Sequence, residues 1–206
     1  MDLFPPYLSM SIRFSAPEVP VFLVNVHPES RQKALTFVDP RLYLACATLV
    51  LGNVLLPLAL HRLPGAGAAL MPILFFTLVA GWRFGLRAAA LTAVLSPLAN
   101  HALTGMPPAP ALQGLILQSA LLGILAALAA ARRPRPTLPL LAAVVLASQG
   151  LILLAATWQA GFPAGMAGVQ HRLPAVLLQI LGGWAALRLL DRFLPAPSVP
   201  EQNIRA

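Results

Sequence analysis

The amino-acid sequence predicts an all-α membrane protein with six transmembrane helices and both termini in the cytoplasm. Of its 206 residues, 58% are hydrophobic and 10% are charged, whereas soluble domains have about 25% charged residues. Long stretches, such as 88–131 and 136–171, contain no charged residue at all. Because about 20 apolar residues are enough to cross a bilayer, we expect a multi-span membrane protein.

Each predicted helix is an apolar segment delimited by proline, glycine or arginine. The first ends before Arg62, and the second, which is short, either tilts little or is partly re-entrant. The third begins after Gly85, the fourth ends at Arg132, and the sixth follows Arg172. Helices are expected because backbone groups in lipid must be bonded within their own segment. The predicted spans are residues 41–61, 67–82, 86–104, 111–131, 138–159 and 173–192.

The orientation follows from the basic residues, which collect in cytoplasmic loops. With the N-terminus inside, Arg62 and Arg172 are the two of 14 basic residues that face outward, so 12 lie inside. The net charge of +8 is therefore attributed to topology, and no nucleic-acid partner is expected. The acidic residues lie in the leader, in the tail or, for Asp191, at the inner end of the last predicted span, so none lies within the predicted membrane interior, where ion coupling usually depends on carboxylates.

The chain divides into three regions. Residues 1–40 are polar and rich in proline, and we expect a poorly ordered cytoplasmic leader or a misassigned start. Residues 41–194 form the predicted membrane domain, and 195–206 form a short cytoplasmic tail.

No motif for catalysis or metal binding is present. The sequence contains no G-x-x-x-x-G-K-[ST] phosphate loop, no H-E-x-x-H and no G-x-S-x-G. Ser96 and His101 would lie about 140° apart on one helix, which disfavours a catalytic dyad. Cys46 is the sole cysteine and is interpreted as a packing residue. We expect no enzymatic activity, no cofactor and no metal site.

Uncharged polar residues gather at the predicted outer ends of the third to sixth helices. Because polar side chains in spanning segments usually face the bundle interior or a cavity, they predict an outward-facing pocket for a polar or anionic small molecule. The alternative is that each one caps a helix or bonds a neighbour. The candidate pocket residues are Asn100, His101, Gln113, Gln118, Thr157, Trp158, Gln159, His171, Arg172 and Gln179.

Small residues are frequent on several helices, and Thr48 with Gly52 forms a small-x-x-x-small pair on the first. Such pairs let helices approach closely. They serve either packing within the bundle or docking of a membrane partner.

The stretch MPILFFTLVAGWRFGLRAAALTAVLSPLANHALTGMPP, residues 71–108, resembles the substrate-binding S components of energy-coupling factor (ECF) transporters. In that family a short apolar helix precedes an aromatic and glycine turn with a basic residue, and then a small-rich helix. The similarity extends over residues 41–194 and includes the Gly182-Gly183-Trp184 step.

This resemblance implies a subunit of a bacterial inner-membrane importer that binds a vitamin or similar micronutrient from outside. Its partners would be a membrane coupling subunit and two cytoplasmic ATPases. It assigns the ligand to the outer loops and outer halves of helices four to six, which hold the candidates from Gln113 to Gln179. The family's Ala-x-x-x-Ala docking pattern is absent from the first helix, where only Thr48 and Gly52 remain. Nickel and cobalt relatives use an N-terminal histidine, whereas this chain begins Met1-Asp2-Leu3.

Two other classes remain open on the sequence alone. One is a packing or assembly subunit without a ligand, or an autonomous transporter. The other is a membrane-embedded enzyme that acts on lipid or peptide. Co-purification of a small molecule would separate the S component from the assembly subunit.

Overall fold

A computed structural model describes residues 35–60, 72–166 and 169–193. The leader up to residue 34, the start of the predicted second span at 67–71 and the tail from residue 194 lie outside the described residues. The side chains of residues 57–60, 160, 164, 165, 170 and 171 also lie outside this description.

The described chain is helical, and the described part of each predicted span lies in a helix or a continuous helical segment. The third helix, α4, covers Leu86–Thr104, which matches the prediction at both ends. The last segment is continuous from Val169 to Phe193 but contains a π-helical turn, η2. The full set is α1 (Pro40–Leu60), α3 (Pro72–Phe84), α4, α5 (Ala109–Arg132), α6 (Leu138–Ala160), α7 (Phe162–Met166), α8 (Val169–Leu177), η2 (Leu178–Gly182) and α9 (Gly183–Phe193).

The predicted loop at 160–172 is wrong in part. Gly161, with φ of 85°, ends α6, but the short helix α7 follows at once. The next helix begins at Val169 rather than at 173, because neither proline nor glycine occurs from Val169 to Arg172. Arg172 therefore lies on a helix and not in a loop.

Among the described residues, three helices are long and apolar enough to cross a membrane: Ala109–Arg132, Leu138–Gln159 and Arg172–Phe193. The apolar helix Pro72–Phe84 is shorter. At 1.5 Å per residue, the 13 residues of α3 reach only about 20 Å, less than the hydrocarbon core of about 30 Å. The structure thus describes a membrane protein, and the count of six spans stays a prediction.

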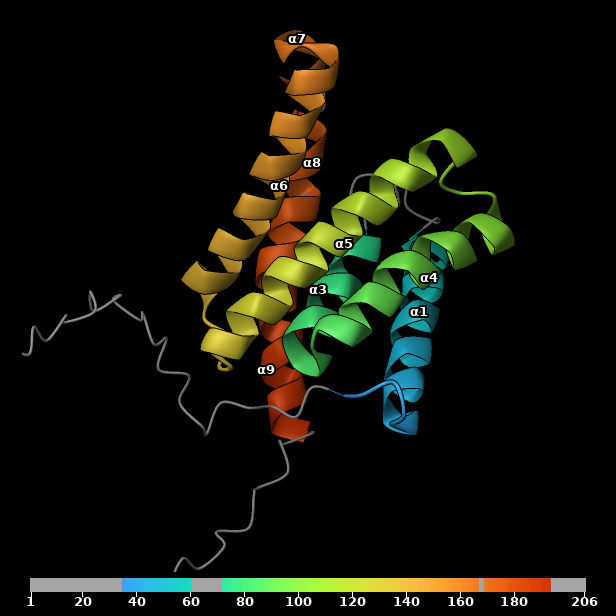
Figure 1. Cartoon of the computed structure of the whole chain (residues 1–206), viewed down its shortest axis with the longest axis vertical. Coiled ribbons are helices and arrows are strands. Elements are labelled where there is room, and N and C mark those ends of the chain that lie inside the picture. Colours follow the sequence, from blue (N-terminus) through green and yellow to red (C-terminus); the bar gives the residue numbers. More distant parts are fainter. Residues whose placement is uncertain (1–34, 61–71, 167–168, 194–206) are drawn as a thin grey trace, which may run out of the picture.

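The short helix α3 lies at the centre of the bundle. Its neighbours are α1, α4, α5, η2 and α9, and 9 of its 13 residues are buried. In Figure 1 the longer helices α4 and α5 run beside it, with α1 next to α4. The core of the bundle therefore forms around a helix of only 13 residues.

Glycines allow α3, α4 and α5 to cross closely. A Cβ atom on Gly81 would lie 2.4 Å from the carbonyl oxygen of Gly123, and one on Gly123 would lie 2.9 Å from the Cβ of Ala89. Ala126 is also fully buried here. Small residues give van der Waals contact between backbones in membrane bundles, so these ones serve packing within the chain.

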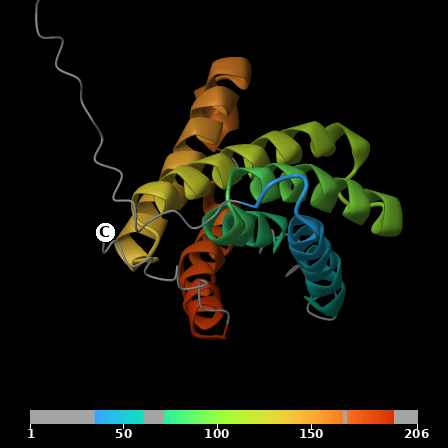
Figure 2. The ribbon, with the colours of Figure 1, turned by 60° about the horizontal axis from the view of Figure 1, so that its bottom comes forward.

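The second half of the chain forms a helical pair, α6 with α8–η2–α9, that contacts the rest through α5 and α3. Figure 2 shows this pair beside the other helices. The upper parts of α6 and α8, with α7, extend beyond α3 in Figure 1.

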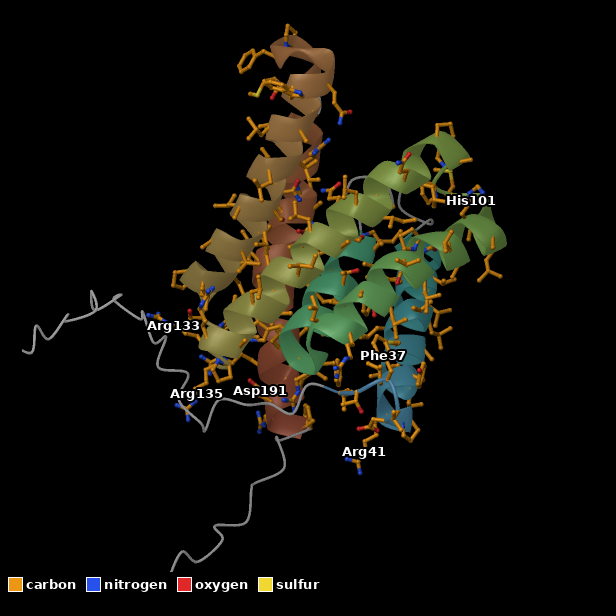
Figure 3. All side chains as sticks on the ribbon, viewed as in Figure 1. Phe37, Arg41, His101, Arg133, Arg135 and Asp191 are labelled. Atoms are coloured by element: carbon orange, nitrogen blue, oxygen red, sulfur yellow. The ribbon has the colours of Figure 1, made fainter. Side chains whose placement is uncertain are left out.

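Basic side chains gather at one end of the molecule. Figure 3 shows Arg41, Arg133 and Arg135 at this end together with Asp191, whereas His101 lies at the opposite end. Asp191 lies 3.9 Å from the guanidinium of Arg83. We call these the basic end and the outer end; that the basic end is cytoplasmic stays a prediction from the charge distribution.

Candidate functional site

The most informative polar residue is Gln179, in the π-helical turn η2. Its side chain is fully buried, and neither Oε1 nor Nε2 has a hydrogen-bond partner among the residues that the structure describes. A buried polar group without a partner costs about 1 to 3 kcal/mol. π-helical turns are rare, and those that occur are frequently found at functional sites. The buried side chain and the π-turn together make Gln179 a candidate for a functional residue.

Two consecutive glycines shape the turn. The amide of Gly183 reaches the carbonyl oxygen of Leu178, five residues back, which is the π-helical bond. A Cβ atom on Gly183 would lie 2.8 Å from Leu78 Cδ2, and one on Gly182 would lie 3.3 Å from Phe75. The glycines thus let η2 approach α3 closely, and this approach encloses Gln179.

A pair of side-chain amides joins α5 to α6. Gln118 Nε2 donates to Gln149 Oε1 over 3.3 Å. Gln118 is buried and Gln149 is half-buried. Beside them, Ser119 is fully buried and its hydroxyl has no partner, whereas the Ser148 hydroxyl donates to the carbonyl oxygen of Val145.

Each of these three glutamines lies near the middle of its own helical segment. Counted from the outer end of their helices, Gln118 is the tenth residue, Gln149 the twelfth and Gln179 the eleventh. At 1.5 Å per residue, each lies about 15 Å from that end, near the middle of a bilayer core. Because α6 contacts both α5 and η2, we group them as the mid-depth glutamines.

Asn100 belongs to a different polar cluster, between α1 and α4. Its Nδ2 donates to the carbonyl oxygens of Asn53 (3.1 Å) and Ser96 (3.2 Å). Asn53 Nδ2 donates to Ser96 Oγ over 2.5 Å. We call Asn53, Ser96 and Asn100 the α1–α4 cluster; it joins α1 to α4.

His101 lies near the outer end of α4. Its Nδ1 is 2.8 Å from the carbonyl oxygen of Pro107, so the ring holds the α4–α5 turn. Figure 3 shows it on the side away from α6 and α8. The structure therefore does not bring His101 together with the candidates on those helices.

The remaining candidates lie toward the outer end. Thr157 donates to the carbonyl oxygen of Leu154, Trp158 is 90% exposed, and Gln113 and Gln159 are exposed. Arg172 is half-buried near the start of α8, while the His171 side chain lies outside the described residues. Exposed tryptophan at a helix end is typical of the membrane interface.

The two docking candidates differ in their surroundings. Thr48 is exposed and its hydroxyl donates to the Leu44 carbonyl. A Cβ atom on Gly52 would lie 2.6 Å from the ring of Phe76, so Gly52 packs against α3. A docking role for this pair stays a prediction.

Asn53, Ser119 and Gln149 are buried or bonded polar residues that the sequence analysis did not select. The predicted site comprised polar residues at the outer helix ends, whereas these three residues lie deeper in their helices. Each of them is a polar side chain inside an apolar helix. Because such a side chain is costly in lipid, it usually faces protein, and this pattern could have identified them from the sequence.

Comparisons with family models, with curated proteins and with solved structures find no match. Over the residues that the structure describes, no three His, Cys, Asp or Glu side chains come together as a metal site would require. The site must be interpreted from its own chemistry: amides that donate and accept hydrogen bonds without charge, set deep between helices.

Proposed function

We propose that this chain is the substrate-binding S component of an ECF-type importer in the bacterial inner membrane, and that it captures a vitamin or similar micronutrient from outside. The observation that carries the proposal is the buried amide of Gln179, which has no partner among the described residues and lies in a turn that contacts α6, the helix of Gln149. A ligand that reached this depth would satisfy the amide. The sequence resemblance supports the same function.

The surroundings indicate the ligand's chemistry. Amide side chains bind neutral groups that both donate and accept, so the part at mid-depth would be uncharged. Arg172 precedes Gln179 by seven residues, which places it about 10 Å nearer the outer end on a similar face of the helix. The ligand would then be elongated, with a neutral polar group at one end and a polar or anionic group near Arg172.

The source of energy would lie in partner subunits. The sequence has no phosphate loop, and within the described helices the acidic residue is Asp191, near the end of α9. A coupling subunit with two ATPases would supply the work, with Thr48 and Gly52 as the candidate docking residues.

The first experiment identifies the ligand and tests the site. Mass spectrometry of an extract from the purified protein should reveal a small molecule, which is then titrated by calorimetry. Gln179→Leu should weaken binding by about tenfold, as expected for one or two neutral hydrogen bonds. Thr48→Val, at an exposed position on α1, is the control and should bind as the parent does.

Thermal stability provides an independent readout for the same variant. Because Gln179 has no partner, Gln179→Leu should leave the stability of the ligand-free protein unchanged or raised. Unchanged affinity in Gln179→Leu would contradict the proposed site. Uptake by liposomes that contain this chain alone would instead favour an autonomous transporter.

A further inference from the structure

The turn between α5 and α6 presents three arginines at the basic end. Arg132, Arg133 and Arg135 are all exposed. Figure 3 shows Arg133 and Arg135 beside each other at this end. We call residues 132–137 the arginine turn.

The backbone of the arginine turn is held at several points. The amide of Arg133 donates to the Ala129 carbonyl over 2.8 Å, and the carbonyl of Thr137 accepts from the amide of Leu141 over 3.0 Å. Between them, the carbonyl of Pro134 accepts a hydrogen bond from the indole Nε1 of Trp82 over 3.0 Å. The turn is therefore fixed to both of its helices and to α3.

Trp82 and the prolines make this arrangement rigid. Trp82 is 2% exposed, and a buried indole generally needs a partner for its N–H. Pro134 and Pro136 restrict their own backbone φ angles, and Pro136 is buried. The guanidinium groups thus project from a preorganised backbone, which lowers the entropy lost when they bind an anion.

The described acidic residues do not neutralise these arginines. Asp191 lies against Arg83, and Asp39 accepts from the backbone amide of Arg41. Within the described residues, therefore, the arginine turn keeps three uncompensated positive charges.

We propose that the arginine turn is a binding site for the phosphate headgroups of anionic phospholipids. The turn joins two helices long enough to cross the membrane, so it lies at headgroup level. Arginine matches phosphate oxygens with two parallel hydrogen bonds, and basic pockets between helices bind acidic headgroups. This site rests on the membrane location of the chain and not on its proposed transport function.

A topology signal alone does not account for the arrangement. The positive-inside rule requires only that basic residues be present near the helix ends. It requires neither a bond from a buried tryptophan nor a fixed backbone. The distinction between fixed geometry and net charge can be tested directly.

The experiment measures lipid binding to the detergent-solubilised full chain by native mass spectrometry. Phosphatidylglycerol should bind in preference to phosphatidylcholine. Arg133→Gln with Arg135→Gln should weaken phosphatidylglycerol binding by roughly twentyfold, given the usual contribution of basic residues near an anionic surface. The matched control is Arg41→Gln with Arg192→Gln, which removes the same charge from exposed sites elsewhere and should lower binding less than about threefold.

Trp82→Phe tests the geometry, since it keeps the ring and the charge but removes the donor to Pro134. We expect a loss of about threefold to fivefold, the range for one weakened ionic contact. Should Trp82→Phe misfold, the comparison of the two double arginine variants still tests whether lipid binds at the arginine turn. Equal losses in both would show that net charge alone attracts lipid, and equal binding of the two lipids would also overturn the proposal. Full competition by soluble glycerol phosphate would reassign the site to free phosphate and overturn the lipid assignment.

Discussion

The α1–α4 cluster and the mid-depth glutamines are both buried polar groups, but they differ in how far they are satisfied. In the α1–α4 cluster, both helices are joined by bonds from Asn53 and Asn100, and Asn53 Oδ1 is the unpaired atom. At mid-depth, the side chain of Gln179 makes no hydrogen bond within the described residues. A satisfied network holds helices together, whereas an unsatisfied amide lowers stability unless a ligand completes it.

Ligand addition should separate the two regions most strongly. The molecule extracted from the protein, at 100 times its Kd, should stabilise the parent by about 2.7 kcal/mol. In Gln179→Leu at the same concentration the gain should be clearly smaller, because affinity falls. Thermal unfolding with and without ligand measures both values. An equal gain in parent and variant would mean that the ligand does not contact Gln179.

Arg172→Ala tests the outer end of the proposed ligand path. If Arg172 pairs with an anionic group, its loss should weaken binding by about 1.5 to 3 kcal/mol, the range for a hydrogen bond to a charged group. Calorimetry measures the effect, with Arg192→Ala on α9 as the control at the basic end. Unchanged affinity would assign Arg172 to the membrane surface.

Asn100→Ala should reverse the pattern seen for Gln179. It removes one bond to α1 and one bond within α4. Because an interhelical bond in a membrane contributes about 0.6 kcal/mol, stability should fall by roughly that amount. Ligand affinity should stay at the parental value. A loss of affinity without a loss of stability would place the α1–α4 cluster in the binding site after all.

Trp158→Ala should have the smallest effect. Because Trp158 is 90% exposed, its removal should change neither stability nor affinity by more than about 0.5 kcal/mol. The same calorimetric and thermal measurements apply. A clear loss of affinity would show that the outer ends of α6 and α8 close over the ligand, and would restore Trp158 to the site.

The sequence predicted the helices closely but the polar contacts poorly. The limits of α4 follow from Gly85 and Gly105, which have φ values of 87° and 71° and leave a local signal. The start of α8 was missed because nothing local distinguishes a first helical turn from a loop at Val169. The π-turn was also missed, although the Gly182-Gly183 step was its local sign.

By itself the sequence determined that the chain is helical, where most helices begin and end, and that basic residues are concentrated in a few segments, because these depend on residues close together in the chain. Only the tertiary structure decided which polar side chains are satisfied. Asn53 bonds to Ser96, 43 residues away in the sequence, and Gln118 bonds to Gln149, 31 residues away. The side chain of Gln179 has no partner among the described residues. Such pairing depends on how helices pack, and small residues such as Gly81 and Gly123 set that packing through contacts that no local pattern contains.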